Sequence, residues 1–146
     1  MRPSEVRQRI LDDHAALRRL LADVQQALAA TPPSAPAIRS LGESLRQRFL
    51  EHLELEDRTL VPALRTIDAW GEERAARLDR EHRHQRERLD EIMGRLRPEE
   101  RAGAELAGDL ARLVREILLD MEHEEKTVLD ENLLRDDVVT TDVEAG

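Results

Sequence analysis

Four stretches of this chain carry apolar residues at every third or fourth position, and short stretches rich in proline or glycine separate them. This spacing places side chains along one side of a helix, so each stretch predicts an amphipathic helix with one buried seam. The breaks are "TPPSAP" at 31–36, "DAWG" at 68–71 and "RPEERAGA" at 97–104. Because short connections join antiparallel neighbours, the pattern predicts an all-α, up-down-up-down antiparallel four-helix bundle.

Each of the four predicted seams is interrupted by residues that can ligate a metal ion. They are three histidines and three carboxylates: His14, His52, Glu56, His82, Asp120 and Glu124. A carboxylate without a partner in a core of leucines would be strongly disfavoured or would keep its proton. Three carboxylates and three imidazoles in one core therefore predict a compensating positive charge, which a metal ion would supply.

Counting along the predicted helices puts these residues in one layer of the bundle. His14 and His52 stand at similar distances from the first break, and Glu56 and His82 stand at similar distances from the second break. At about 1.5 Å per residue, the members of each pair reach the same height. Asp120 reaches this layer only if the last helix begins near Glu105, so we expect 98–104 to stand outside that helix or to form a separate turn.

A different ligand set, with His123, is the alternative. Two Asp-x-x-His pairs, at 79–82 and 120–123, resemble the Glu-x-x-His pairs of ferritin-like di-iron bundles. In that arrangement His123 would be a ligand and would displace Glu124. His14 argues against it, because ferritin-like sites place a carboxylate on the first helix.

The third stretch carries two more polar residues close to His82. His84 lies about 200° around the helix from His82, so we expect its side chain in solvent. Gln85 lies one turn from His82 on the seam, where it either contacts the metal ligands or is a simple polar residue of the core.

The composition excludes several classes of function. A formal charge of −9 argues against nucleic acid or an anionic membrane surface as partner. The absence of cysteine and tyrosine excludes disulfides, thiolate metal sites and tyrosyl radicals. The many arginine and acidic residues fit pairs one turn apart on solvated helix faces. No apolar run approaches a membrane span or a signal peptide, so we expect a cytoplasmic protein.

The stretch around His52 and Glu56 resembles a known family. "LEHLELEDRTLVPAL" is similar to the H-x-x-x-E-(E/D)-x-x-L-x-P-x-L signature of haemerythrin-like, or HHE cation-binding, domains. "LDDHAALRRLL", "REHRHQRERL" and "DMEHEEKTVLDENLL" look like the first, third and fourth helices of that family. The resemblance covers residue 8 to about residue 134. We therefore expect one domain over 1–134 and a C-terminal tail over 135–146.

The resemblance implies two non-haem iron ions, although manganese or zinc would also suit the donors. It assigns His14 and His52 to one iron, His82 and Asp120 to the other, and Glu56 and Glu124 as bridges between them. Haemerythrin-like domains usually have histidine where this chain has Asp120, and haemerythrins proper have a second histidine one turn from the ligand on the third helix. The chain offers only Leu78 or Arg86 there.

The carboxylate-rich set predicts oxidation rather than reversible oxygen binding, because anionic oxygen donors favour Fe(III). The interpretation is a non-haem di-iron protein that reacts with O₂, peroxide or NO as an oxidase, a peroxide scavenger or a sensor. Two alternatives stay open: a non-catalytic iron- or oxygen-binding module, and a metal-free helical interaction protein whose polar residues fix the register of the bundle. The sequence names no organic substrate and no protein partner.

Overall fold

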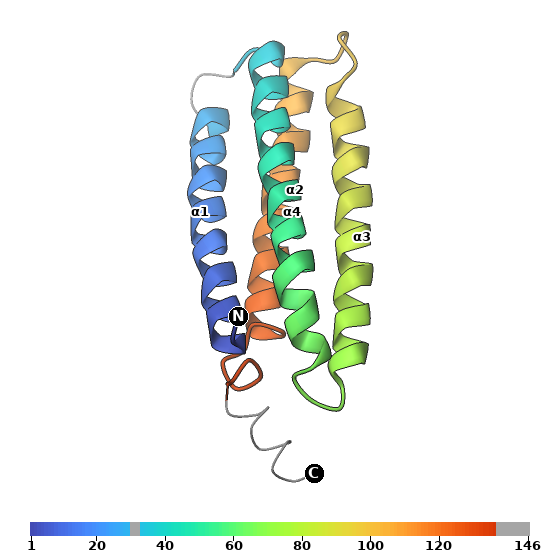
Figure 1. The fold of residues 1–146 in the computed structure, drawn as a ribbon. Coiled ribbons are helices and arrows are strands. Elements are labelled where there is room, and N and C mark those ends of the chain that lie inside the picture. The colour runs from blue at the N-terminus through green and yellow to red at the C-terminus, as the bar shows by residue number, and fades with distance from the viewer. Residues whose placement is uncertain (30–32, 137–146) are drawn as a thin grey trace.

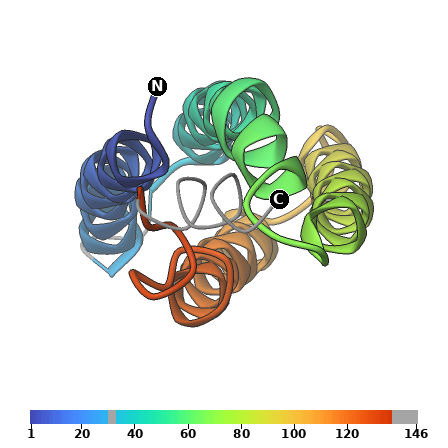
Figure 2. The ribbon, with the colours of Figure 1, turned by 60° about the horizontal axis from the view of Figure 1, so that its bottom comes forward.

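The computed structural model describes residues 1–29 and 33–136, and this part of the chain forms four helices and no strand. The helices are α1 (Pro3–Ala29), α2 (Ala35–Arg65), α3 (Gly71–Leu96) and α4 (Gly103–Lys126). They alternate in direction (Figure 1) and follow one another around the bundle in chain order (Figure 2). The predicted all-α, up-down-up-down bundle is confirmed. In the described ranges, no helix is both long and apolar enough to cross a membrane.

The third break sets the height of α4. Residues 97–102 form a separate turn, and α4 begins at Gly103, two residues before the predicted Glu105. Arg39 of α2 donates hydrogen bonds to the backbone carbonyls of Leu96 (2.8 Å) and Pro98 (2.7 Å). This turn is therefore held against the beginning of α2, and the expected interruption between α3 and α4 is confirmed.

The apolar interior consists of two separate cores. The large core contains Leu17, Leu21, Val24, Ile38, Leu45, Phe49, Leu53, Leu89, Ile92, Met93, Leu96, Leu106, Leu110, Leu113, Val114, Ile117 and Met121. The small core contains Val6, Ile10, Leu60, Val61, Leu64, Ile67, Ala75, Leu78, Leu129 and Leu134. On α1, α2 and α3 the change from one core to the other occurs at a buried histidine or glutamate, and on α4 the large core ends before the buried Glu124. A polar layer thus crosses the bundle between two apolar regions.

The segment after α4 closes the small core. Leu129 and Leu134 are buried there, and Arg7 of α1 donates a hydrogen bond to the carbonyl of Leu129 at 2.7 Å. The backbone N–H and the hydroxyl of Ser4 donate to Asp136 at 3.0 and 2.7 Å. The predicted boundary between 134 and 135 falls within this segment and stays a prediction, and residues 137–146 lie outside the described ranges.

The tight α2–α3 connection depends on Gly71. A Cβ atom at this position would overlap the backbone carbonyl oxygens of Leu64 and Arg65, whereas a Cβ at Gly94, within α3, would meet no other atom within 4 Å. The absence of a side chain at Gly71 therefore lets α3 begin directly against the end of α2.

Two glycine substitutions test this packing. Gly71→Ala should lower the free energy of unfolding by about 1–3 kcal/mol, because the backbone must shift to admit the methyl group. Gly94→Ala should raise it by about 0.5–1 kcal/mol, because alanine favours the helix. Urea unfolding followed by circular dichroism measures both. Equal changes in the two variants would show that the connection relaxes without cost.

Candidate metal centre

The polar layer brings together side chains from all four helices. His14 of α1, His52 and Glu56 of α2, and Glu124 of α4 each offer a ligand-type atom, and these atoms lie within 4.8 Å of one another. His82 of α3 lies next to this group, with its Nε2 3.4 Å from Glu56 Oε1. All five side chains are buried. The structure therefore brings four of the six predicted residues into one group and places His82 beside it.

Four of these five residues leave a polar atom without a hydrogen-bond partner. His14 Nε2 lies 3.0 Å from Glu124 Oε1, and His52 Nε2 lies 3.0 Å from Glu56 Oε1. Four buried atoms nevertheless have no partner in hydrogen-bonding geometry among the described residues. They are His14 Nε2, Glu56 Oε2, His82 Nε2 and Glu124 Oε1. Such atoms normally have partners. Imidazole nitrogens and carboxylate oxygens that converge in this way suit a transition-metal cation.

The outer nitrogen of each histidine is held by a carboxylate, and an arginine holds that carboxylate in turn. In the first of these His–carboxylate–Arg triads, His14 Nδ1 lies 2.7 Å from Glu125 Oε2. Both carboxylate oxygens of Glu125 accept hydrogen bonds from Arg18, each at 2.8 Å. The histidine and the arginine lie one turn apart on α1, and the carboxylate comes from α4.

The second triad connects α1 and α2. His52 Nδ1 lies 2.6 Å from Asp13 Oδ2, and Arg48 donates to Asp13 Oδ1 at 2.6 Å. Burial alone would lower the pKa of His52, but the hydrogen bond to Asp13 and the neighbouring Glu56 raise this pKa to about 9. The same hydrogen bond from His52 lowers the pKa of Asp13 to about 2. Without a metal ion, His52 and Asp13 thus form an ion pair.

The third triad connects α2 and α3. His82 Nδ1 lies 2.6 Å from Asp57 Oδ1, and Arg86 donates to Asp57 Oδ2 at 2.7 Å. A carboxylate at Nδ1 favours the tautomer that carries its proton there. The triads therefore fix the three rings with Nε2 directed into the layer, which is the orientation that a metal ligand requires.

Sequence reasoning missed the triads. It interpreted the arginines as members of solvated pairs within one helix, but the three triad arginines bind carboxylates of a neighbouring helix. Two features of the sequence indicate the triads. On three helices an acidic residue stands directly beside a candidate ligand, and an arginine stands four residues from each of the three histidines. These residues are Asp13, Asp57 and Glu125, with Arg18, Arg48 and Arg86.

The two central glutamates differ in their affinity for protons. Burial would raise the pKa of Glu56, but hydrogen bonds from Glu124, His52 and His82 hold it below its usual range. Burial raises the pKa of Glu124 well above its usual range, and the charge of Glu56 raises it further. Burial also lowers the pKa of His14. The metal-free layer therefore keeps protons that a metal ion would displace.

Asp120 lies at the edge of the layer. It lines a hollow of about 10 Å³ together with His52, Glu56 and Glu124, but its carboxylate is not among the atoms that converge. No hydrogen bond or ion pair ties it to another residue in the described ranges, and burial raises its pKa to about 6. An aspartate side chain is shorter than glutamate or histidine, so it reaches less far toward the centre. Its role as a ligand stays a prediction.

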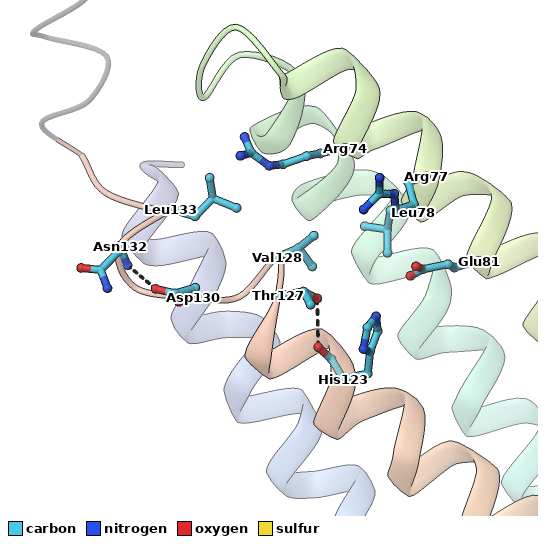
Figure 3. A pocket seen from close by; sticks show the side chains of 10 residues that line it. All are labelled: Arg74, Arg77, Leu78, Glu81, His123, Thr127, Val128, Asp130, Asn132 and Leu133. Atoms are coloured by element: carbon cyan, nitrogen blue, oxygen red, sulfur yellow. Dashed lines mark hydrogen bonds between the residues drawn. The ribbon is translucent and has the colours of Figure 1, made fainter.

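The two remaining histidines lie outside the layer. His84 is exposed, as its position on the far side of α3 predicts. His123 is exposed as well, and its ring points toward Glu81 on the wall of an outer pocket (Figure 3). This position gives no support to the ferritin-like alternative, in which His123 would replace Glu124.

Comparison with known proteins agrees with the geometry. A family model described as the hemerythrin HHE cation binding domain matches residues 6–131. The match begins within α1, includes the whole of α2, α3 and α4, and contains all six predicted ligands. No curated protein and no solved structure matches the chain significantly.

Removal of one triad carboxylate should weaken metal binding. Asp13→Asn leaves His52 without its anionic partner, and the loss of such a partner typically lowers metal affinity about 10- to 100-fold. Asp12→Asn is the matched control, because Asp12 is exposed and accepts a hydrogen bond from Gln8 of the same helix. Competition with a chromophoric chelator for Co²⁺ measures both affinities. Equal affinities of the two variants for Co²⁺ would show that Asp13 has no role in orienting His52.

The pH dependence of metal binding should report the same triad. Below about pH 9 His52 holds a proton that a metal ion must displace, so affinity should rise with pH and level off near pH 9. In Asp13→Asn the pKa of His52 falls, and affinity should level off at a lower pH. Co²⁺ titrations between about pH 6 and pH 9.5 provide the comparison. An unchanged profile would mean that another group supplies the displaced proton.

Proposed function

Since the chain belongs to the hemerythrin family of HHE cation-binding domains, we propose that its polar layer holds two non-haem iron ions and that the protein reacts with O₂, peroxide or NO. The observation that carries this proposal is the group of buried imidazole and carboxylate atoms that face one another without hydrogen-bond partners. A cation would compensate these atoms, whereas a metal-free interaction protein would leave them unsatisfied.

The proposed ligands comprise three histidines and three carboxylates: His14, His52, Glu56, His82, Asp120 and Glu124. Glu56 would hold iron together with both His52 and His82, because its Oε1 lies 3.0 Å from His52 Nε2 and 3.4 Å from His82 Nε2. When bound, iron would supply Lewis-acid and redox chemistry. The protein contributes fixed imidazole rings, carboxylates that neutralise charge, and two apolar cores that exclude water. Manganese or zinc would fit the same donors.

The size of the site favours very small reactants. The hollow beside His52, Glu56 and Glu124 measures about 10 Å³, which is about the least space that a single water molecule occupies. A dioxygen, peroxide or nitric oxide molecule requires only a small rearrangement there, whereas an organic substrate does not fit into this hollow. We therefore propose an oxidase, a peroxide scavenger or a sensor of these molecules.

Elemental analysis tests the metal site. Wild-type protein purified without chelator should contain about two iron ions per chain, as carboxylate-bridged bundles of this kind do. His52→Ala and Glu56→Ala should each lose at least half of that metal. His84→Ala should lose none, because the His84 ring lies in solvent. Full metal content in both core variants would contradict the proposed site.

Oxidation in air tests the reactivity. Asp120 supplies an anionic donor where histidine is usual in the family, and anionic donors stabilise Fe(III). Iron-loaded protein that has been reduced without air should convert rapidly to a stable ferric spectrum when oxygen is admitted. Asp120→His should slow this conversion. A wild-type spectrum that reverts when the solution is degassed would show reversible oxygen binding, and the oxidase interpretation would be wrong.

A further inference from the structure

The polar layer is closed at three of the four contacts between neighbouring helices. A triad carboxylate crosses from α4 to α1, another from α1 to α2, and a third from α2 to α3. Each is held by an arginine, so a hydrogen-bonded ion pair spans the contact at the height of the layer. In the part of the chain that the structure describes, the α3–α4 contact has no triad.

The α3–α4 contact contains a series of hollows instead. An outer pocket of about 460 Å³ opens between the first turns of α3 and the segment after α4 (Figure 3). It shares Glu81 and His123 with a middle hollow of about 190 Å³. The middle hollow shares Gln85, Asp120 and Glu124 with the inner hollow of about 10 Å³ beside the candidate ligands. The shared lining residues place the three hollows side by side along the α3–α4 contact, from the surface to the layer.

The sequence explains why a triad is missing here. Glu81 directly precedes His82 of the layer, just as Asp13 directly precedes His14. A fourth triad would need a histidine of α4 within the layer for Glu81 to hold, but α4 presents Asp120 there, and His123, whose ring points toward Glu81, lies outside the layer. The negative charge of Glu81 acts unfavourably on Asp120, and two carboxylates cannot join the helices without a proton or a cation between them.

Gln85 stands where the middle and inner hollows meet. Its side-chain Oε1 is buried without a hydrogen-bond partner among the described residues, so it is available to a passing cation or to the water bound to one. Three arginines line the series of hollows. Arg74 binds Asp68 and Arg88 binds Glu116, whereas Arg77 lines the outer pocket together with the carboxylates of Glu81 and Asp130.

We propose that the α3–α4 contact is the entrance through which divalent metal ions reach the layer, with Glu81 at its mouth and Gln85 at its inner end. This inference rests on the proposed metal site. Successive carboxylate and amide oxygens suit a hard divalent cation, and a negatively charged cleft raises the local concentration of cations and their rate of association.

Blocking the inner end tests the entrance. Metal-free wild-type protein and Gln85→Phe are mixed with Co²⁺ in a stopped-flow instrument, and the visible absorption of bound Co²⁺ is followed. The phenylalanine ring should slow uptake by at least about tenfold, because loading then requires the helices to part, while the final Co²⁺ content stays equal. Gln47→Phe, the same substitution at an exposed position of α2, is the matched control.

A charge reversal at the mouth provides a test that leaves the core intact. Glu81→Lys should slow Co²⁺ uptake by about tenfold at low ionic strength and by much less in high salt. Glu51→Lys is the control, because Glu51 precedes His52 as Glu81 precedes His82, but it is exposed on α2. This variant decides the question if circular dichroism shows that Gln85→Phe does not fold.

The outcomes separate the two proposals. Slow uptake in either variant, with full final content, supports the entrance. If both variants load at the rate of their controls, the α3–α4 entrance is wrong while the metal site stands. If wild-type protein takes up no Co²⁺ at any concentration, the proposed metal site itself fails.

Discussion

The structure depends on the burial of ionisable groups between two apolar cores. Imidazoles and carboxylates lose their hydration there, and an isolated charge in such surroundings is strongly disfavoured. The chain offsets this cost on both sides of each histidine ring. On the outer side, each Nδ1 meets a carboxylate that an arginine neutralises. On the inner side, the Nε2 atoms and the glutamate oxygens face one another, and a cation between them would complete the balance.

The triads also fix how the helices face each other. Each triad joins a histidine and an arginine of one helix to a carboxylate of a neighbouring helix. A rotation of either helix would therefore break the hydrogen bonds of the triad. Leucine side chains alone can pack over a wider range of helix rotations than the triads allow. The polar layer thus determines the relative rotation of α1, α2 and α3, and α4 joins the set through Glu125.

The sequence predicted the fold and much of the layer because both depend on position along a helix. Apolar periodicity and the proline- and glycine-rich breaks defined four helices, and counting residues placed His14, His52, Glu56, His82 and Glu124 at one height. The triads could not be predicted in this way, because they depend on how adjacent helices are rotated toward each other. The same limit applies to Asp120: periodicity places it on the seam, but the length of its side chain decides how far it reaches.

The missing fourth triad gives the bundle a preferred direction of motion. Separation of α3 from α4 at the height of the layer breaks no triad, whereas separation of any other neighbouring pair breaks one. Local opening follows the contacts that cost least to break. At the height of the layer, α3 and α4 can therefore separate at a lower cost than the other neighbouring pairs, and the Arg88–Glu116 ion pair is the polar contact that such an opening would strain. Fluctuations that let amide protons exchange with solvent would concentrate at this contact, while the triads between α1 and α2 keep the histidine rings in register.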